Sequence, residues 1–357
     1  MVSRSCLIRW KTRHLGSSIH PAVSFSRSLF ASSQVYQTSW VQAVSNAEKV
    51  VGFPTSFLSL RSVANDEISN IAVYLKKLIG TGHPLITTAK NLVYSNDKTH
   101  QTRGLLVLLM SKAAKRESGQ DILPEQRTLA EITELVHTAH LIHTGVINLN
   151  TPNANLEMGN KMAVLCGDFF LAHSCVQLAT LQNLKVVELI AQAISDYSTA
   201  EFIDIIASEN DSALDRWSQQ MTLRYGSLIA HACQSTLILG NNVELIESGK
   251  SFGLEIALAW QANIEIQSFK SNANRADHVL SKLFPETPFV DVVANFQAVR
   301  DRHVNAALKI LTAFPQNDAS LALVCLPQPL PIDFFIPGVS YHKNDKAKRS
   351  NIPTCQK

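Results

Sequence analysis

The stretch AEITELVHTAHLIHTGVINLN, residues 130–150, combines a strongly periodic helical pattern with an unreactive ending. Its apolar residues recur at steps of three and four, which is the spacing of one face of an α-helix. They are Ile132, Leu135, Val136, Ala139, Ile142 and Val146. The pattern runs into Thr144-Gly145-Val146-Ile147-Asn148, where no side chain can hold a metal ion firmly or transfer a proton. We therefore expect this helix to support a fold and an interface rather than a reaction.

Length and composition predict a globular protein of modest charge. The chain has 357 residues, of which 46% are hydrophobic and 17% charged, so it can bury a large core. Its net charge of +3 is too small to indicate nucleic-acid binding. The sequence has no basic run with interleaved aromatics, no Cys-His zinc pattern and no Gly-rich phosphate loop, which excludes these classes of site.

The two ends of the chain differ in composition from its middle. Residues 1–47 contain no Asp or Glu but carry several Arg and Lys among many serines. This pattern is typical of a mitochondrial transit peptide, and a disordered basic tail is the alternative. Residues 327–357 are rich in Pro and Lys and lack periodicity, which predicts disorder. We therefore predict a targeting or disordered segment over 1–39, one helical domain over 40–326 and a disordered tail over 327–357, in a protein of the mitochondrial matrix.

Between these ends the hydrophobic pattern predicts successive helices and no strands. Besides the opening helix, they are expected over 69–79, 105–114, 162–181, 186–197, 217–239, 243–261 and 305–313, with polar loops over 115–126 and 148–159. The predicted fold class is all-α, a helical bundle. No uninterrupted apolar run reaches the roughly 18–20 residues that span a bilayer, so we predict no transmembrane segment. Cys166, Cys175 and Cys233 lie in apolar helical patterns and are expected to be buried thiols.

Several blocks, in order, resemble the trans-isoprenyl (polyprenyl) diphosphate synthase family. The opening stretch resembles the helix that carries the family's first aspartate-rich motif. The other blocks are GNKMAVLCGDFFLAHSC (159–175), AISDYSTAEF (193–202), RYGSLIAHAC (224–233) and ALAWQANIEIQSF (257–269). Together they cover most of residues 45–326 and imply an isoprenoid-synthase-type helical bundle. Within this family, residues 47–72, 102–114 and 264–269 look more like the non-catalytic second subunit of heteromeric decaprenyl or solanesyl diphosphate synthases.

The resemblance implies a metal-dependent site whose ligands are mostly missing here. Family members hold Mg²⁺ on two aspartate clusters, and the ions bind the diphosphate of an allylic substrate. The three positions of the first cluster hold Thr144, Gly145 and Asn148. Those of the second cluster hold Ile264, Glu265 and Ser268. Only one of these six positions therefore keeps a carboxylate. We predict no catalytic residue and no bound metal in this chain. We expect Mg²⁺ to be bound by a catalytic partner.

The cations that bind diphosphate in the family are also depleted. Of its Gly-Gly-Lys-Arg-x-Arg-Pro segment only Arg103 persists, within KTHQTRG (98–104). Arg224 and Tyr225 stand where the family has a Lys-Thr pair. Arg103 and Arg224 are candidate residual diphosphate contacts, or else ordinary surface or interface arginines. Because losing one preorganised electrostatic group commonly costs about 10²–10³ in rate, the combined losses predict an inactive isolated chain.

Other metal-binding interpretations of the same helix are weak. Glu134-x-x-His137 could be half of a di-iron carboxylate site, but that site needs a second copy, which the sequence lacks. His137, His140 and His143 step by three residues, which winds them around a helix and keeps them from converging on one ion. We therefore expect no metal site in this helix.

Three functions remain open from the sequence. The first is a non-catalytic subunit that has too few metal ligands to work alone. It would belong to a heteromeric polyprenyl diphosphate synthase, an enzyme that joins isopentenyl diphosphate to an allylic diphosphate for the ubiquinone side chain. The second is a self-sufficient prenyltransferase in which Glu265, Asp168 and Glu201 hold Mg²⁺. The third is a helical mitochondrial lipid-binding module.

Lys161 and Asp168 could be a relic of substrate binding or a structural salt bridge.

Overall fold

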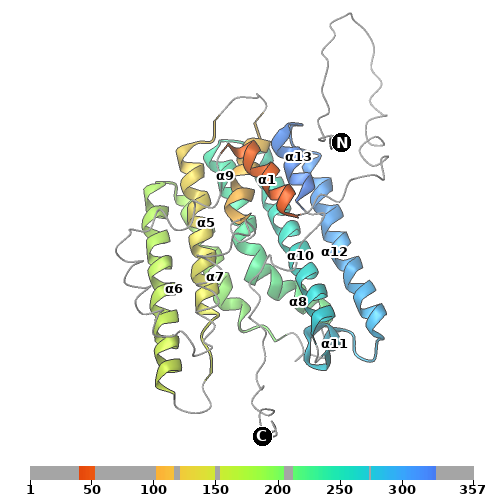
Figure 1. Cartoon of the computed structure of the whole chain (residues 1–357). Helices are drawn as coiled ribbons and strands as arrows, with labels where there is room; N and C mark the ends of the chain where they lie inside the picture. Colours follow the sequence, from red (N-terminus) through yellow and green to blue (C-terminus); the bar gives the residue numbers. More distant parts are fainter. Residues whose placement is uncertain are drawn as a thin grey trace, which may run out of the picture. The chain divides into compact units, whose positions relative to one another are not determined.

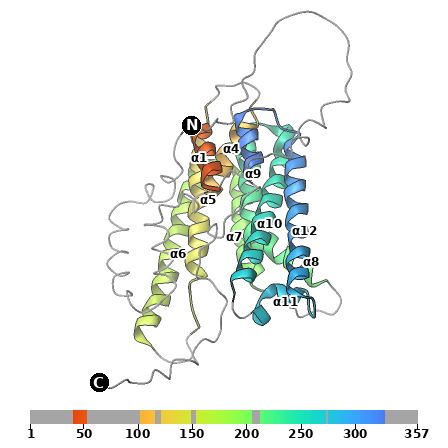
Figure 2. The ribbon, with the colours of Figure 1, turned by 45° about the vertical axis from the view of Figure 1, so that its right-hand side comes forward.

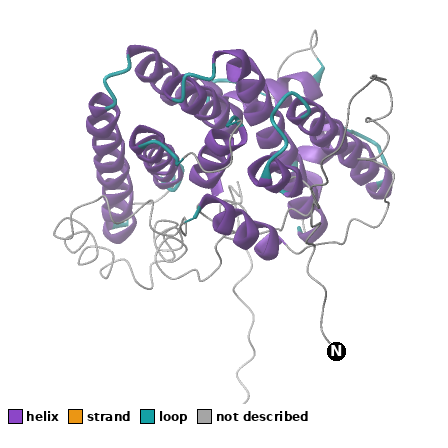
Figure 3. Cartoon of the chain, turned by 90° about the horizontal axis from the view of Figure 1, so that it is seen from above, coloured by secondary structure: helices purple, strands orange, loops and turns teal. Residues whose placement is uncertain are grey.

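The computed structural model describes residues 40–52, 102–115, 121–148, 153–204, 212–272 and 275–326. The chain divides into units 1–37 and 38–357, and the described residues all belong to the second. Their regular elements are all helical, which confirms the predicted fold class (Figures 1 and 3). The predicted helix over 69–79 and both predicted terminal segments lie outside the described residues, apart from the start of the domain at Trp40.

Five long helices form most of the described bundle. They are α5 (Pro124–His143), α6 (Ala154–Thr180), α7 (Leu184–Ala200), α10 (Ile246–Ser271) and α12 (Phe289–Leu311). The shorter helices are α1 (Trp40–Val51), α4 (Thr102–Ala113), α8 (Ala213–Met221), α9 (Ser227–Leu239), α11 (Val279–Leu283) and α13 (Asp318–Cys325). Single turns occur at η2 (Thr222–Gly226), η3 (Val243–Leu245) and η4 (Arg275–Asp277).

Helix α4 lies at the centre of one end of the bundle. It is apolar on nearly every side, and all of its residues except Lys112 are buried. It packs against α1, α5, α9 and α13, so elements from both ends of the described chain meet around it. On one flank α6 runs beside α5, and on the other α12 runs beside α10 (Figures 1 and 2). This arrangement brings the ends of α5 and α10, which carry the two degenerate clusters, into one bundle.

Several helices begin or end beyond their predicted limits. The loop predicted over 148–159 is wrong at its far end, because the Asn153 side chain accepts the Asn155 and Leu156 amides and starts α6 there. The loop over 115–126 is wrong in the same way, because Pro124 opens α5. Helix α10 continues to Ser271, and α12 starts at Phe289 rather than near 305. The first residues of a helix are often polar, so a hydrophobicity pattern predicts a loop where the helix has already begun.

The helix predicted over 217–239 contains an irregularity. A π-helical turn, η2, joins α8 to α9 without a break in the helical path. Such a turn accommodates one extra residue and is frequent at functional sites. Its Arg224 is buried, and a Cβ at its Gly226 would lie 2.7 Å from Leu254 Cδ1 of α10. The turn therefore faces Arg224 inward while keeping α9 close to α10.

Among the described residues, helix α6 carries an apolar face that is exposed. The exposed residues on α6 include Met158, Val164, Leu165, Ala172, Cys175 and Val176, which we call the α6 face. Leu165 is 52% exposed and Val176 is 65% exposed. Cys175 is exposed, so its prediction as a buried thiol is wrong, whereas Cys166 and Cys233 are buried as predicted. The reason is that α6 packs mainly along α5, which leaves its opposite side without cover.

Among the described helices, α6 alone is long and apolar enough to cross a membrane by length and composition, with 39% of its apolar window buried. No uninterrupted apolar run of the sequence reaches this length here, because Lys161 and Asp168 divide the run. Both of these charged residues are exposed near the middle of the α6 face. Charged side chains at the centre of a bilayer are costly, which favours a protein surface over lipid as the neighbour of this face.

Candidate functional site

The first degenerate cluster lies where α5 ends. Thr144 is the C-cap of α5, and its hydroxyl donates to the Leu141 carbonyl at 2.9 Å. Gly145 continues the turn, with its amide donating to the Ile142 carbonyl at 3.1 Å. Asn148 is exposed. These three positions therefore end a helix, and none of them offers a carboxylate to an ion.

His143, the one residue that matches the family pattern here, packs against α6. Its Nε2 lies 3.1 Å from Asp168 Oδ1 and 3.3 Å from the Val164 carbonyl oxygen. A Cβ on Gly167 would lie 2.2 Å from the His143 ring, so glycine at this position lets the ring lie against α6 in its present orientation. Asp168 thus pairs with His143, not with Lys161 as the salt-bridge prediction supposed. The retained Gly-Asp block fastens the end of α5 to α6.

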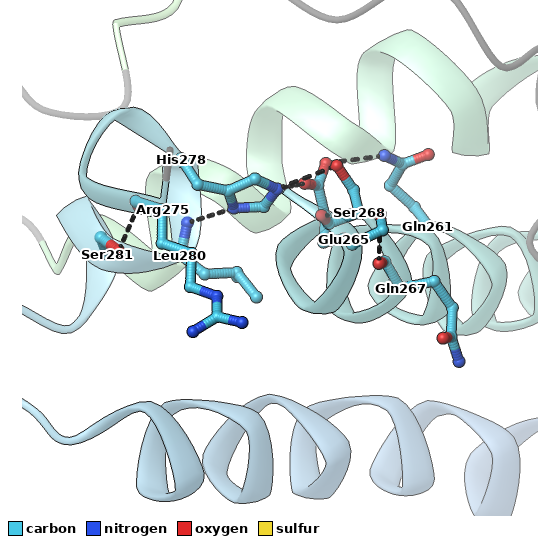
Figure 4. A network of polar contacts seen from close by, with 9 residues as sticks. Gln261, Glu265, Gln267, Ser268, Arg275, His278, Leu280 and Ser281 are labelled. Atoms are coloured by element: carbon cyan, nitrogen blue, oxygen red, sulfur yellow. Dashed lines mark hydrogen bonds and ion pairs between the residues drawn. The ribbon is translucent and has the colours of Figure 1, made fainter. Parts of the chain in front are cut away.

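The second degenerate cluster lies near the C-terminal end of α10. Ile264 and Glu265 are half-buried and Ser268 is exposed. Glu265 accepts a hydrogen bond from Gln261 Nε2 at 2.9 Å, and His278 Nε2 lies 3.8 Å from its other oxygen (Figure 4). Burial raises the pKa of Glu265 to about 7, against the hydrogen bond from Gln261 and the charge of Arg224, which both lower it. The one surviving carboxylate is therefore already engaged and partly neutral at pH 7.

Arg103 lies inside the bundle beside a carboxylate. It is 2% exposed, and Glu134 of α5 is 1% exposed. Glu134 Oε1 accepts the Gly104 amide at 2.7 Å, at the start of α4, where free amides and the helix dipole favour an anion. Burial raises the pKa of Glu134 to about 7, although the charge of Arg103 opposes this rise. Arg103 is therefore a buried structural cation rather than the surface or interface arginine that the sequence left open.

Arg224 is buried, and its partner is the carboxylate of the exposed Glu201. Its Nη2 lies 2.5 Å from Glu201 Oε1, just beyond the end of α7, and Arg224 is 6% exposed. Nearby, the His140 ring stacks on Tyr197 with centroids 3.9 Å apart. Burial, assisted by the charges of Arg224 and Arg103, lowers the pKa of His140 to about 3, so this histidine is neutral. This part of the bundle therefore contains the stacked rings of His140 and Tyr197 and an arginine that is paired with a carboxylate of the same chain.

The residues present do not fit a magnesium–diphosphate site. Mg²⁺ needs several oxygen ligands in octahedral geometry, usually carboxylates with water and phosphate. Within the described ranges no three His, Cys, Asp or Glu side chains gather closely enough to hold a metal ion. The three carboxylates of the alternative ligand set instead each contact different side chains. Glu265 contacts Gln261 and His278, Asp168 contacts His143, and Glu201 contacts Arg224. This geometry speaks against that ligand set.

The sequence alone missed three contacts that shape this region. Glu134 was noticed only as half of a metal motif, and its place beneath α4 depends on how two helices cross. Glu201 was noticed as part of a family block, without its contact to Arg224. His278 was not noticed, because it is a single histidine in a connecting segment with no motif around it. A capping Asn or a Pro in the first turn of a helix leaves a local signal in the sequence. These three contacts leave none, because they join elements that are distant in sequence.

An all-helical bundle in which the remains of two acid clusters lie near the C-terminal ends of two long helices is typical of the isoprenyl diphosphate synthase class. The chain belongs to the polyprenyl synthetase family, whose model matches residues 87–274. Among solved structures, a geranyltranstransferase from Methanosarcina mazei superposes with a TM-score of 0.58 at 19% identity, covering 82% of this chain and 97% of that one. An Arabidopsis medium/long-chain length prenyl pyrophosphate synthase gives 0.52 at 24% identity, covering 71% and 97%. These two likenesses concern the fold.

Relatives in sequence narrow the comparison. The chain is 42% identical over 252 residues to the human protein named all trans-polyprenyl-diphosphate synthase PDSS2. The matched region covers 64% of this chain and 63% of that protein. It is 32% identical over 303 residues to a probable mitochondrial hexaprenyl pyrophosphate synthase of Neurospora crassa, covering 66% and 67%. The chain therefore spans less than two thirds of the human relative it matches.

Proposed function

We propose that this chain is the non-catalytic, stabilising subunit of a heteromeric all-trans polyprenyl diphosphate synthase. In this proposal a catalytic homologue holds Mg²⁺ and joins isopentenyl diphosphate to an allylic diphosphate. The product would be the side chain of ubiquinone, made in the mitochondrial matrix. The likeness to PDSS2 and to a mitochondrial hexaprenyl synthase supports this assignment. The expected assembly is a heterotetramer.

The observation that carries the proposal is the state of the two clusters. Five of six ligand positions lack a carboxylate, and the sixth, Glu265, is occupied by Gln261 and His278. Of the two retained arginines, Arg224 forms an ion pair with Glu201, and Arg103 is buried within electrostatic reach of Glu134. The fold is kept while the groups that would bind metal and diphosphate are absent or used internally. A subunit that supports an active partner needs the fold, but it does not need the groups that bind metal and diphosphate.

The α6 face supports the second half of the proposal, a protein partner. A stable interface is apolar at its centre and buries side chains that would otherwise be exposed. The α6 face offers Leu165 and Val176 on a helix that its own bundle covers on one side only. Lys161 and Asp168 on the same face can fix the register of a partner by charge. A homologous subunit with a comparable helix would cover this face.

Co-expression with a catalytic homologue from the same organism tests the proposal. We expect the chain alone to incorporate no labelled isopentenyl diphosphate, the partner alone to show little activity, and the co-purified pair to be active. Leu165→Asp should abolish co-purification, because it places a charge in the apolar α6 face. Val290→Asp is the matched control, because Val290 is 72% exposed on α12, on the other flank of the bundle. Robust turnover by the isolated chain would establish a self-sufficient prenyltransferase instead, and a failure to recover any prenyl synthase would favour a lipid-binding module.

A further inference from the structure

The segment that follows α10 folds back against the end of that helix. It comprises η4 and α11 and ends at Phe284, and we call residues 275–284 the return segment. Figure 4 shows its His278 pointing at Glu265 and Ser268, the two polar members of the second degenerate cluster. The His278 Nε2 lies 3.1 Å from Ser268 Oγ and 3.8 Å from Glu265 Oε2. The remains of the acid cluster therefore face a side chain of their own chain.

The two ring nitrogens of His278 have different roles. The Leu280 amide donates to Nδ1 at 3.2 Å, so Nδ1 is an acceptor and the neutral ring carries its proton on Nε2. Through this contact His278 is the N-cap of α11. The Nε2 proton then points at the oxygens of Ser268 and Glu265. One ring thus starts α11 with one nitrogen and fastens it to α10 with the other.

Apolar contacts hold the return segment at the same place. Leu280 is fully buried in the cluster that contains Ile266 and Phe269 of α10. The Phe269 and His278 rings lie 5.2 Å apart. Arg275, at the start of the segment, lies over the Phe289 ring at 4.2 Å and so reaches the start of α12. The segment therefore contacts α10 through both a polar and an apolar anchor.

We propose that the second degenerate cluster has become a latch, in which Glu265 and Ser268 hold the return segment closed through His278. The imidazole N–H faces the oxygens of Ser268 and Glu265, so the polar side chains of the cluster contact a donor from their own chain. This inference concerns residues of this chain only and does not depend on the proposed partner.

Backbone hydrogen exchange of the full chain tests the latch. Ser268→Ala removes the oxygen closest to His278, and a hydrogen bond of ordinary net strength predicts about threefold to tenfold faster exchange of the Leu280 and Phe284 amides. His278→Ala should give a larger increase, because it also removes the cap of α11. Ser271→Ala is the matched control, since its hydroxyl donates only to carbonyls of its own helix, at Gln267 and Ser268. Equal exchange in the Ser268 and Ser271 variants would overturn the proposal.

A second measurement does not depend on any variant folding. Nitrogen NMR of the unmodified chain, at a pH where the ring is neutral, should show His278 fixed in one tautomer, with an unprotonated Nδ1 and a protonated Nε2, instead of the rapid exchange between both tautomers that a solvent-exposed ring shows. Observing a ring that exchanges freely between both tautomers would mean that His278 is not held, and would also overturn the latch.

Discussion

The pair of Arg103 and Glu134 offers a direct measurement of what holds the bundle together. Both side chains are almost fully buried, and Glu134 also accepts the Gly104 amide at the start of α4. Glu134 and Arg103 are buried opposite charges that influence each other electrostatically, and removing one of two such charges typically costs about 3–5 kcal/mol, because the other stays buried with less compensation. A domain is stable by about 5–15 kcal/mol, so Glu134→Ala should remove a large part of the total.

Two further variants separate the charge from the hydrogen bond. Glu134→Gln keeps a carbonyl oxygen for the Gly104 amide and removes the charge, so we expect an intermediate cost of about 1–3 kcal/mol. Glu131→Gln is the control, because Glu131 lies less than one turn away on the same helix and should change stability by less than about 0.5 kcal/mol. Arg103→Met combined with Glu134→Met should cost less than the sum of the two single changes, since it removes both charges together.

The assay is urea unfolding followed by circular dichroism at pH 8, above the raised pKa of Glu134, where the carboxylate is ionised. The free energy of unfolding should fall in the order Glu131→Gln, Glu134→Gln, Glu134→Ala. A cost below about 1 kcal/mol for Glu134→Ala, or strict additivity in the double variant, would refute the view that this pair is coupled inside the bundle.

The remaining predictions concern close packing and pH. Gly253→Ala should destabilise by about 1–3 kcal/mol, because its Cβ would lie 2.7 Å from the Ile229 carbonyl oxygen, which is backbone and cannot swing away. Gly167→Ala should cost less, because it meets the half-exposed His143 side chain, which can rotate; thermal unfolding of both variants checks this order, and equal costs would contradict it. Glu265 has a pKa of about 7 in the folded chain against an ordinary 4.5, so the unfolded chain releases this proton first as pH rises. The free energy of unfolding should therefore fall between about pH 4.5 and 7. The fall from this group is at most about 3 kcal/mol. Glu265→Gln should lose less stability over that range in urea titrations at pH 5 and 7.5, and an unchanged pH dependence would rule out Glu265 as the source.

The fold was largely predictable because helical periodicity survives wherever one face of a helix is buried. The apolar stripe of α5 and the nearly all-apolar α4 are visible in the sequence and lie in helices of the structure. Helix ends were less predictable, because Asn153 and Pro124 are polar or helix-breaking residues that start helices when they occupy a cap. Cys175 was misplaced since no periodicity tells which apolar face another molecule would cover.

The candidate site was predictable in position and not in detail. The positions of both clusters, and the absence of their carboxylates, follow from the aligned blocks alone. What each remaining group does depends on contacts across the bundle: Glu201 meets Arg224 from 23 residues away, on another element. His278 is similar, since its contact with Ser268 requires the chain to reverse after α10. Such pairings are set by helix crossing and chain reversal, which residue patterns do not encode.

The open apolar side of α6 has a consequence for the life of the newly made chain. Exposed aliphatic side chains of this kind are what chaperones retain and proteases remove when a subunit lacks its counterpart. Under the proposed function, in which a catalytic subunit covers this face as the counterpart of this chain, the cellular amount of this protein should follow the synthesis of that counterpart rather than its own messenger level. Depleting that counterpart would lower the steady-state level of this chain without changing its transcription, and inhibiting mitochondrial proteolysis would restore it in aggregated form.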